Sequence, residues 1–293
     1  WVDSLDYQYP ILSTRHRHVR PRSTCEKCVT SCAEGAITIE DGKAEINTKK
    51  CTECGACMSA CPVQGIAGIY PKRTIEENQL VVTGKNTPTV KELLILHKKG
   101  VTTIVAKTEE EQERWKEQIE QANIVLEKLN RNPFTFSTNL IKKEKSITRR
   151  ELFSLWKSEG KAVLREATPA KWRFNQKDLD LPKYYPSYQF ATVIIEREKC
   201  SLCEACTKLC PKTCFAIGVR EFVINPQRCT DCKLCVDTCP EKAITVTKNI
   251  SEVEVKTYSI FESECKTCGN KMCTVYDART IFKTIESRDH DAQ

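Results

Sequence analysis

The residues of this chain best suited to chemistry are its 19 cysteines, most of which stand in short, regularly spaced runs. In three runs, gaps of two, two and three residues separate four cysteines, and a proline follows the last. These runs are Cys51, Cys54, Cys57 and Cys61 before Pro62; Cys200, Cys203, Cys206 and Cys210 before Pro211; and Cys229, Cys232, Cys235 and Cys239 before Pro240. Thiolates with this spacing converge on a compact core from several directions, which is how cubane iron–sulfur clusters are held.

Two other uses of cysteine fit the spacing less well. Zinc ribbons use pairs of cysteines separated by longer loops, rather than four cysteines within about eleven residues. Disulfide scaffolds are usually smaller, and an odd number of cysteines leaves at least one thiol unpaired. Because thiolate ligands favour a reducing compartment, we expect the chain to be cytoplasmic.

The three runs resemble the cluster-binding motif of bacterial-type two-cluster [4Fe-4S] ferredoxins, and the chain resembles this family twice, over about residues 20–70 and 194–248. The duplication is similar to that of polyferredoxins and other multicluster electron-transfer subunits. In this family the fourth cysteine of each run ligates the other cluster. For the second module the resemblance therefore implies one cluster on Cys200, Cys203, Cys206 and Cys239 and another on Cys229, Cys232, Cys235 and Cys210. Cys214 is extra to the motif, and we expect it to be a buried thiol near a cluster.

The first module departs from the family pattern, because Arg22 stands where its first cysteine is expected and Ala33 replaces the proline. The resemblance still implies one complete set of ligands, consisting of Cys51, Cys54, Cys57 and Cys32, whereas the other set has only Cys25, Cys28 and Cys61. Three outcomes stay open for this incomplete site: a [4Fe-4S] cluster with a non-cysteine ligand, a [3Fe-4S] cluster, or no cluster. His16 or His18 could supply a fourth ligand, since imidazole replaces thiolate in some iron–sulfur centres.

The C-terminal part of the chain holds a last group of cysteines, Cys265, Cys268 and Cys273. Their spacing resembles half of a zinc knuckle, with His290 as a candidate fourth ligand. Zinc, a further cluster, plain thiols and a site shared with a partner are the alternatives.

Between the cysteine runs, the sequence predicts regular elements. Apolar and polar residues alternate from residue 37 to 47 around Asp41-Gly42, which indicates a β-hairpin. Residues 79–82, 101–106 and 134–136 are expected strands, and two helices separate them. The first helix opens on a capping box from Thr89 to Glu92, and the second carries a stripe of apolar residues at helical spacing, namely Trp115, Ile119, Ala122, Leu126 and Leu129. A further helix is expected from Thr148, before an irregular linker over 168–192.

The predicted fold class is therefore α+β, with two ferredoxin-like dicluster modules flanking a small α/β domain of βαβαβ order and a linker helix. The expected segments are a first module, the α/β domain, a helix with linker, a second module and a C-terminal extension, spanning residues 1–70, 71–140, 141–192, 193–248 and 249–293.

The charge and hydropathy of the chain argue against nucleic-acid and membrane-spanning roles. The formal net charge is +7, but three [4Fe-4S] clusters with thiolate ligands would contribute about −2 each and bring the total to about +1. No apolar run approaches the ~20 residues of a membrane span, and no signal peptide is apparent at the N-terminus.

The expected function is single-electron relay, because clusters ligated only by cysteine have no open coordination position. The expected cofactors are three [4Fe-4S] clusters, a fourth cluster of [4Fe-4S] or [3Fe-4S] type, and zinc as one alternative at the C-terminus. The expected partners are a larger redox enzyme of the molybdopterin, hydrogenase or formate dehydrogenase type and an electron donor or acceptor, with docking to a membrane complex left open. No glycine-rich phosphate loop or HExxH motif is present, so we do not expect the chain to be an enzyme by itself. The alternative is a redox enzyme with an open iron at the three-cysteine site.

Overall fold

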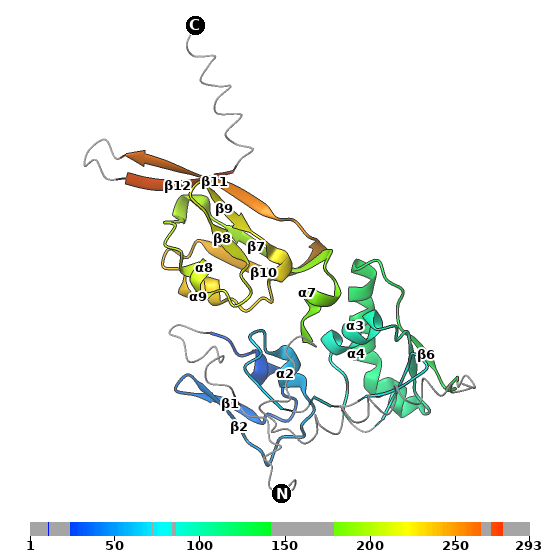
Figure 1. The fold of residues 1–293 in the computed structure, drawn as a ribbon. Helices are drawn as coiled ribbons and strands as arrows, with labels where there is room; N and C mark the ends of the chain where they lie inside the picture. Colours follow the sequence, from blue (N-terminus) through cyan, green and yellow to red (C-terminus); the bar gives the residue numbers. More distant parts are fainter. Residues whose placement is uncertain are drawn as a thin grey trace, which may run out of the picture. The chain divides into compact units, whose positions relative to one another are not determined.

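The structure, a computed structural model, describes the chain over residues 11, 24–68, 70–71, 73–83, 86–141, 179–264 and 271–277, with the backbone alone from 261 onward. The chain forms two compact units (Figure 1), residues 1–19 with 26–184 and residues 20–25 with 185–293. Both units mix short helices with small sheets, as the predicted fold class requires. The predicted division into five segments stays a prediction.

The first unit has a cysteine-rich part and an α/β part. The cysteine-rich part is built around the predicted hairpin. Strands β1 (Ile37–Glu40) and β2 (Lys43–Ile46) pair antiparallel. Asp41 and Gly42 between them have φ angles of 49° and 74°, as a tight two-residue hairpin turn requires. The short helices α1 (Lys27–Thr30) and α2 (Ala56–Ala60) carry cysteines on either side of the hairpin.

The second part of the first unit has the predicted βαβαβ order. Its sheet has the strand order β3-β4-β5-β6, in which β4, β5 and β6 are parallel and β3 adds an antiparallel edge that the sequence did not predict. Helices α3 and α4 connect the parallel strands and pack against each other. In chain order these elements are β3 (Thr74–Glu76), β4 (Gln79–Val81), α3 (Val90–Lys98), β5 (Thr103–Val105), α4 (Glu109–Lys128) and β6 (Thr135–Ser137).

The two long helices begin and pack as their sequences indicate. The Thr89 hydroxyl accepts a hydrogen bond from the Glu92 N–H at the start of α3, and the Thr108 hydroxyl accepts one from the Glu111 N–H at the start of α4. Such N-caps satisfy backbone donors that have no partner within the helix. The predicted apolar stripe of α4 is buried, and Trp115 in it is fully inaccessible.

Glu92 does not complete the predicted capping box, because its carboxylate binds residues that precede the α/β sheet. The Arg73 guanidinium contacts both carboxylate oxygens, at 2.8 and 3.0 Å, and the Tyr70 hydroxyl donates to one of them at 3.1 Å. Both charged side chains are only 7% exposed. Helix α3 also places Ile95 in one core with Met58 of α2. The cysteine-rich part and the α/β part of this unit therefore share packed and polar contacts.

The second unit contains two antiparallel sheets. Strand β7 pairs with β10 in one sheet, and the other has the order β12-β11-β9-β8. After the short helix α7 (Leu181–Tyr184), which belongs to the first unit, the elements are β7 (Tyr188–Ile195), η4 (Arg197–Lys199), α8 (Ala205–Leu209), β8 (Phe215–Ile217), β9 (Glu221–Ile224), η5 (Pro226–Arg228), α9 (Leu234–Thr238), β10 (Ile244–Glu252), β11 (Lys256–Glu264) and β12 (Lys271–Asp277).

The prediction of an irregular linker over 168–192 is wrong for its last part, because α7 occupies Leu181–Tyr184 and β7 begins at Tyr188. Alternate residues of this strand, including Gln189 and Ala191, are buried. The prolines that precede the strand, Pro182 and Pro186, suggested a longer irregular segment than exists. The helix predicted from Thr148 lies outside the described residues.

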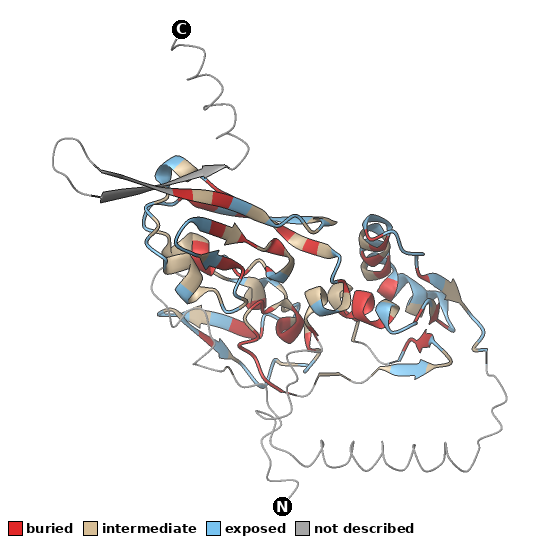
Figure 2. Cartoon of the chain, turned by 45° about the horizontal axis from the view of Figure 1, so that its top comes forward, coloured by how far each residue is buried: buried red, intermediate tan, exposed pale blue. Residues whose placement is uncertain are grey.

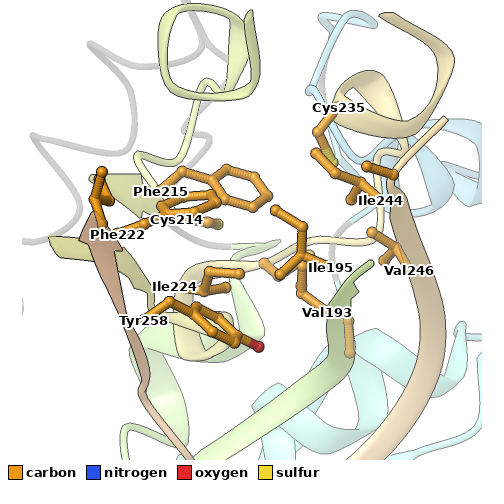
Figure 3. Packing of buried hydrophobic residues seen from close by; sticks show 14 residues of the cluster. Val193, Ile195, Cys214, Phe215, Phe222, Ile224, Cys235, Ile244, Val246 and Tyr258 are labelled. Atoms are coloured by element: carbon orange, nitrogen blue, oxygen red, sulfur yellow. The ribbon is translucent and has the colours of Figure 1, made fainter. Parts of the chain in front are cut away.

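Both sheets of the second unit contribute to one apolar core, shown close up in Figure 3. Val193 and Val246 come from the β7–β10 sheet, whereas Phe215, Phe222 and Tyr258 come from the other. Figure 2 shows buried residues recurring along these strands. Several cysteines belong to the same core, namely Cys214, Cys229 and Cys235, with Cys200, Cys206, Cys210 and Cys239 packed against it.

Replacing Arg73 with methionine should destabilise the first unit by about 3–5 kcal/mol, because the buried carboxylate of Glu92 loses its charged partner. The matched control is Lys116→Met, since Lys116 pairs with Glu113 at 3.2 Å on the surface, and an exposed pair contributes at most about 1 kcal/mol. Urea unfolding followed by circular dichroism would compare the two variants. Similar small losses in both would contradict the structural role of the buried pair.

Candidate metal centres

The three complete cysteine runs share one backbone conformation. In each run, the second and fourth residues after the first cysteine have φ angles between 51° and 79°, in the left-handed region. These residues are Glu53 and Gly55, Leu202 and Glu204, and Asp231 and Lys233. Five of the six are not glycine, so the conformation is costly at most of these positions. Because the same costly conformation recurs in three separate runs, we infer that the three loops have the same structural role.

These loops fit the binding of a cluster that is negatively charged overall, because its four thiolate ligands outweigh the positive charge of the iron core. Left-handed residues that alternate with right-handed ones turn successive backbone N–H groups toward one concave side, and such nests occur at phosphate and iron–sulfur sites. A five-residue helix follows each loop and contains the third cysteine of the run, as Cys57 in α2, Cys206 in α8 and Cys235 in α9.

In the first unit, four cysteines from two separate runs line one hollow of about 320 Å³, which is partly open to solvent. They are Cys51, Cys54, Cys57 and Cys32, the set that the resemblance implied. The β-hairpin supplies Ile37 and Ile46 to the wall. Four thiols around one hollow with an apolar wall are the surroundings that a cysteine-ligated cluster needs.

The second unit repeats this arrangement in a hollow of about 350 Å³, also partly open to solvent. Its four cysteines are Cys200, Cys203, Cys206 and Cys239, again the crossed set. The wall includes Ile195, Ile217 and Ile244. Cys203 is the one exposed cysteine among those whose side chains the structure describes, so this hollow lies at the surface of its unit.

The remaining predicted set of the second unit is also gathered together, but at a buried position. The charges of Cys232, Cys229 and Cys210 act on Cys235. Each of the three cysteines of the run is 8% exposed. The charge of Cys206, which belongs to the surface set, also reaches Cys235. The two sets of this unit are therefore electrostatic neighbours.

Burial and crowding make these cysteines hard to ionise without a cation. Burial raises the pKa of Cys57 and Cys206 to about 12, and the charges of neighbouring cysteines raise it as well. The pKa of Cys235 is raised for the same reasons. A positively charged iron core would reverse this effect, because it favours the deprotonated sulfurs that ligation needs.

A second repeated feature follows the last cysteine of each run. The third residue after it has a φ angle between 51° and 57°, and the N–H of the fourth residue donates to the cysteine sulfur at 3.1–3.4 Å. The donor and acceptor pairs are Ala36 and Cys32, Gly65 and Cys61, Cys214 and Cys210, and Ala243 and Cys239. Hydrogen bonds to ligand sulfurs are one means of tuning cluster potentials.

Cys214 is buried near candidate ligands, as expected, and the structure specifies which ones. Its thiol makes side-chain hydrogen bonds with Cys210 and Cys229. The pKa of Cys210 is lowered to about 6 despite its burial. The hydrogen bond with the Cys214 thiol is the largest cause, and backbone N–H groups add to it. The same thiol lowers the pKa of Cys229. The sequence suggested proximity to a cluster, but nothing in it identified these two partners.

The incomplete run of the first module differs in its backbone as well as in its sequence. By alignment with the complete runs, Glu26 holds the position of the second left-handed residue, yet its φ angle is −123°. Cys28 and Cys61 are buried in the first unit, whereas the half-buried Cys25 belongs to the short segment grouped with the second. His16 and His18 lie outside the described residues. The occupancy of this site stays a prediction.

The C-terminal candidate site is only partly within the described residues. Cys265, Cys268 and His290 lie outside them, and Cys273 is in β12, opposite Glu262 of β11. Within the part of the chain that the structure describes, no three His, Cys, Asp or Glu side chains converge closely enough to hold a single metal ion. The zinc alternative at this position stays a prediction.

Sequence reasoning missed the residues that support the Cys51–Cys57 loop from outside. A Cβ atom on Gly55 would lie 2.7 Å from Pro71 Cδ and 2.9 Å from Tyr70 Cε2. Glutamate and lysine occupy this position in the other two complete runs, so a glycine here was the one available signal of a close approach. Tyr70 and its partner Glu92 connect this loop to the α/β part of the unit.

Comparison with known protein families agrees with this description. Models of the 4Fe-4S dicluster domain match residues 23–65, 192–240 and 228–275. The matches cover both cysteine-rich regions, as the resemblance implied, and extend to the strands after the last complete run.

Two curated proteins resemble parts of the chain. One is a subunit of the ion-translocating oxidoreductase complex of Methanosarcina acetivorans, which is 48% identical over 42 residues, 14% of this chain and 16% of that protein. The other is the isethionate sulfite-lyase activating enzyme of Desulfovibrio desulfuricans, which is 37% identical over 62 residues, 20% of each chain. The chain thus spans a fifth or less of these relatives. Among the described residues, no helix is long and apolar enough to cross a bilayer.

Gly55→Ala should reduce the iron bound at the Cys51–Cys57 loop, because the new methyl group would force Tyr70 and Pro71 away. We expect a loss approaching the four iron atoms of one cluster, measured by iron and sulfide analysis after anaerobic reconstitution. Gly35→Ala is the matched control, since Gly35 also has a positive φ angle but no atom within 4 Å of its Cβ position. Equal losses in both variants would mean that backbone strain alone, rather than the close approach, governs occupancy.

Proposed function

Since the chain belongs with the duplicated 4Fe-4S ferredoxins, we propose that it relays single electrons between a larger oxidoreductase and a second redox partner. The clusters would supply the redox chemistry, with each complete set of cysteines holding one [4Fe-4S] cluster. We assign them to Cys51, Cys54, Cys57 and Cys32; to Cys200, Cys203, Cys206 and Cys239; and to Cys229, Cys232, Cys235 and Cys210. The second unit would hold two of them near each other and control their access from solvent.

The observation that carries the proposal is the adjacency of two cysteine sets that differ in exposure. One set includes the exposed Cys203, whereas the other includes Cys235, which is 8% exposed. Cys206 packs against the apolar core that contains Cys235, so the two sets lie close together within one unit. A surface centre next to a buried one is the arrangement that a relay needs, because electrons can enter at the surface and continue inside.

The relationship to a component of an ion-translocating oxidoreductase complex supports a redox complex as the partner. We propose docking on such an assembly, with molybdopterin enzymes, hydrogenases and formate dehydrogenases as the candidate classes. We propose that the α/β part of the first unit takes part in this docking. Its packing on the cysteine-rich part through Ile95, and the ion pair between Arg73 and Glu92, would hold a bound partner at a constant distance from the Cys51–Cys57 loop.

The purified chain should be brown and contain at least about 12 iron atoms, the number that three four-iron clusters require. EPR-monitored redox titration should resolve these centres as one-electron couples. Cys54→Ser should lower the iron content by up to about four atoms per chain, whereas Thr52→Ser in the same loop should leave it unchanged. A colourless chain that binds zinc and no sulfide after reconstitution would contradict the proposal.

A second candidate function is an enzyme that uses an open iron at the site of Cys25, Cys28 and Cys61. The different backbone of this run favours a centre unlike the other three, and one relative is an activating enzyme. Cyanide, as a small exogenous ligand, would distinguish the two functions. A change in the EPR signal of a single cluster would support the open-iron enzyme, and unchanged signals would support the relay.

A further inference from the structure

The outer side of helix α2, which carries Cys57, is covered by helix α3. Met58 is fully inaccessible and Ser59 is 4% exposed. By alignment of the three complete runs, the residue equivalent to Ser59 is the exposed Lys208 in α8 and the half-buried Asp237 in α9. Among the helices of the complete runs, α2 is therefore the one in which this position is buried.

The start of α3 holds the end of α2 through two polar contacts. The hydroxyl oxygens of Thr89 and Ser59 lie 2.8 Å apart. The Lys91 ammonium donates to the carbonyl oxygen of Ser59 at 3.0 Å. Because carbonyl groups in the last turn of a helix have no partner within that helix, this contact provides one from outside. The α/β part of the unit thus places a cation on the helix that carries Cys57.

The position of Lys91 is explained by α2 and not by its own helix. Lys91 is the second residue of α3 and is half-buried. The first turn of a helix carries partial positive charge, so it favours acidic side chains over lysine. Glu92 supplies the acidic side chain of this turn, but Arg73 compensates its charge at 2.8 Å. A lysine at this position does not stabilise α3, whereas it does contact α2.

The charge of Lys91 lies close to a predicted cluster ligand. Ser59 follows Cys57 by two residues, which is a rise of about 3 Å along a helix axis. Since Met58 and Ser59 are buried, water is excluded from this part of the unit, and charges interact more strongly there than in water. A cluster that accepts one electron gains one negative charge. A fixed cation nearby therefore stabilises the reduced state more than the oxidised state.

We propose that Lys91 raises the reduction potential of the [4Fe-4S] cluster on the Cys51–Cys57 loop, so that this cluster holds an electron more firmly. The inference rests on the proposed function, because it requires that this cluster is present. The surface cluster of the second unit has no equally buried counterpart to this cation. Lys208 of α8 is 73% exposed and pairs with Glu204 at 3.1 Å, so solvent and that carboxylate screen its charge.

The test replaces Lys91 with methionine in the full chain and follows each cluster by EPR-monitored redox titration. The signal of the Cys51–Cys57 loop is identified as the one that Cys54→Ser removes. We expect the midpoint potential of this signal to fall in Lys91→Met, while the iron content and the other signals stay as in the wild type. At a fixed potential the ratio of reduced to oxidised cluster should fall by up to about tenfold, which equals about 59 mV for one electron.

Two control variants separate the charge of Lys91 from its packing. Lys91→Arg keeps the charge and should keep the potential. Lys98→Met removes the same charge from the exposed last turn of the same helix and should also leave the potential unchanged.

An unchanged potential in Lys91→Met would overturn the inference, and so would an equal fall in either control. Loss of about four iron atoms from Lys91→Met would overturn it as well, because Lys91 would then be a structural support of α2. In each of these cases the relay itself stands. A wild-type chain without iron and sulfide would instead contradict the proposed function.

Discussion

Four cysteine thiolates gathered inside a protein repel one another, and burial makes each of them harder to ionise. Burial and neighbouring cysteines both raise the pKa of Cys57, Cys206 and Cys235 in this chain. A compact cationic core would relieve the conflict, because its charge of about +2 offsets part of the four negative charges at once. The remaining features of the cysteine-rich regions follow from the need to surround such a core. Each complete run has two left-handed residues in its loop and its third cysteine in a short helix, and apolar strand residues line the two hollows.

The left-handed backbone conformation occurs in the loops of the complete cysteine runs. Leu202 and Glu204 adopt a conformation that side chains usually avoid, and Asp231 and Lys233 adopt it again in the next run. Glu26, the equivalent of Glu204 and Lys233 in the incomplete run, does not. The loop conformation therefore accompanies the complete set of cysteines rather than the general fold of the module.

The α/β part of the first unit is more than an appended domain, because its polar and apolar contacts reach the loop around Gly55. Tyr70 packs over that glycine and bonds to Glu92, which pairs in turn with Arg73. A buried ion pair is costly to desolvate but is also costly to break. It therefore fixes the position of helix α3 relative to the cysteine-rich part of the unit.

The sequence by itself determined the features that depend on local spacing. Ligand runs, the hairpin at Asp41-Gly42 and the helices that follow Thr89 and Thr108 could all be predicted, because covalent geometry and nearby hydrogen bonds specify them. The crossed grouping of cysteines came from family resemblance, and the two hollows gather cysteines in that order.

Only the tertiary structure decided which distant residues meet. It extended β7 back to Tyr188, paired β11 with β9, directed Glu92 away from its capping box and placed Cys214 in one core with Cys229 of the next run. None of these contacts joins neighbours along a single run or helix. Long-range pairing depends on which apolar surfaces pack together, and a local pattern of residue types does not contain that information.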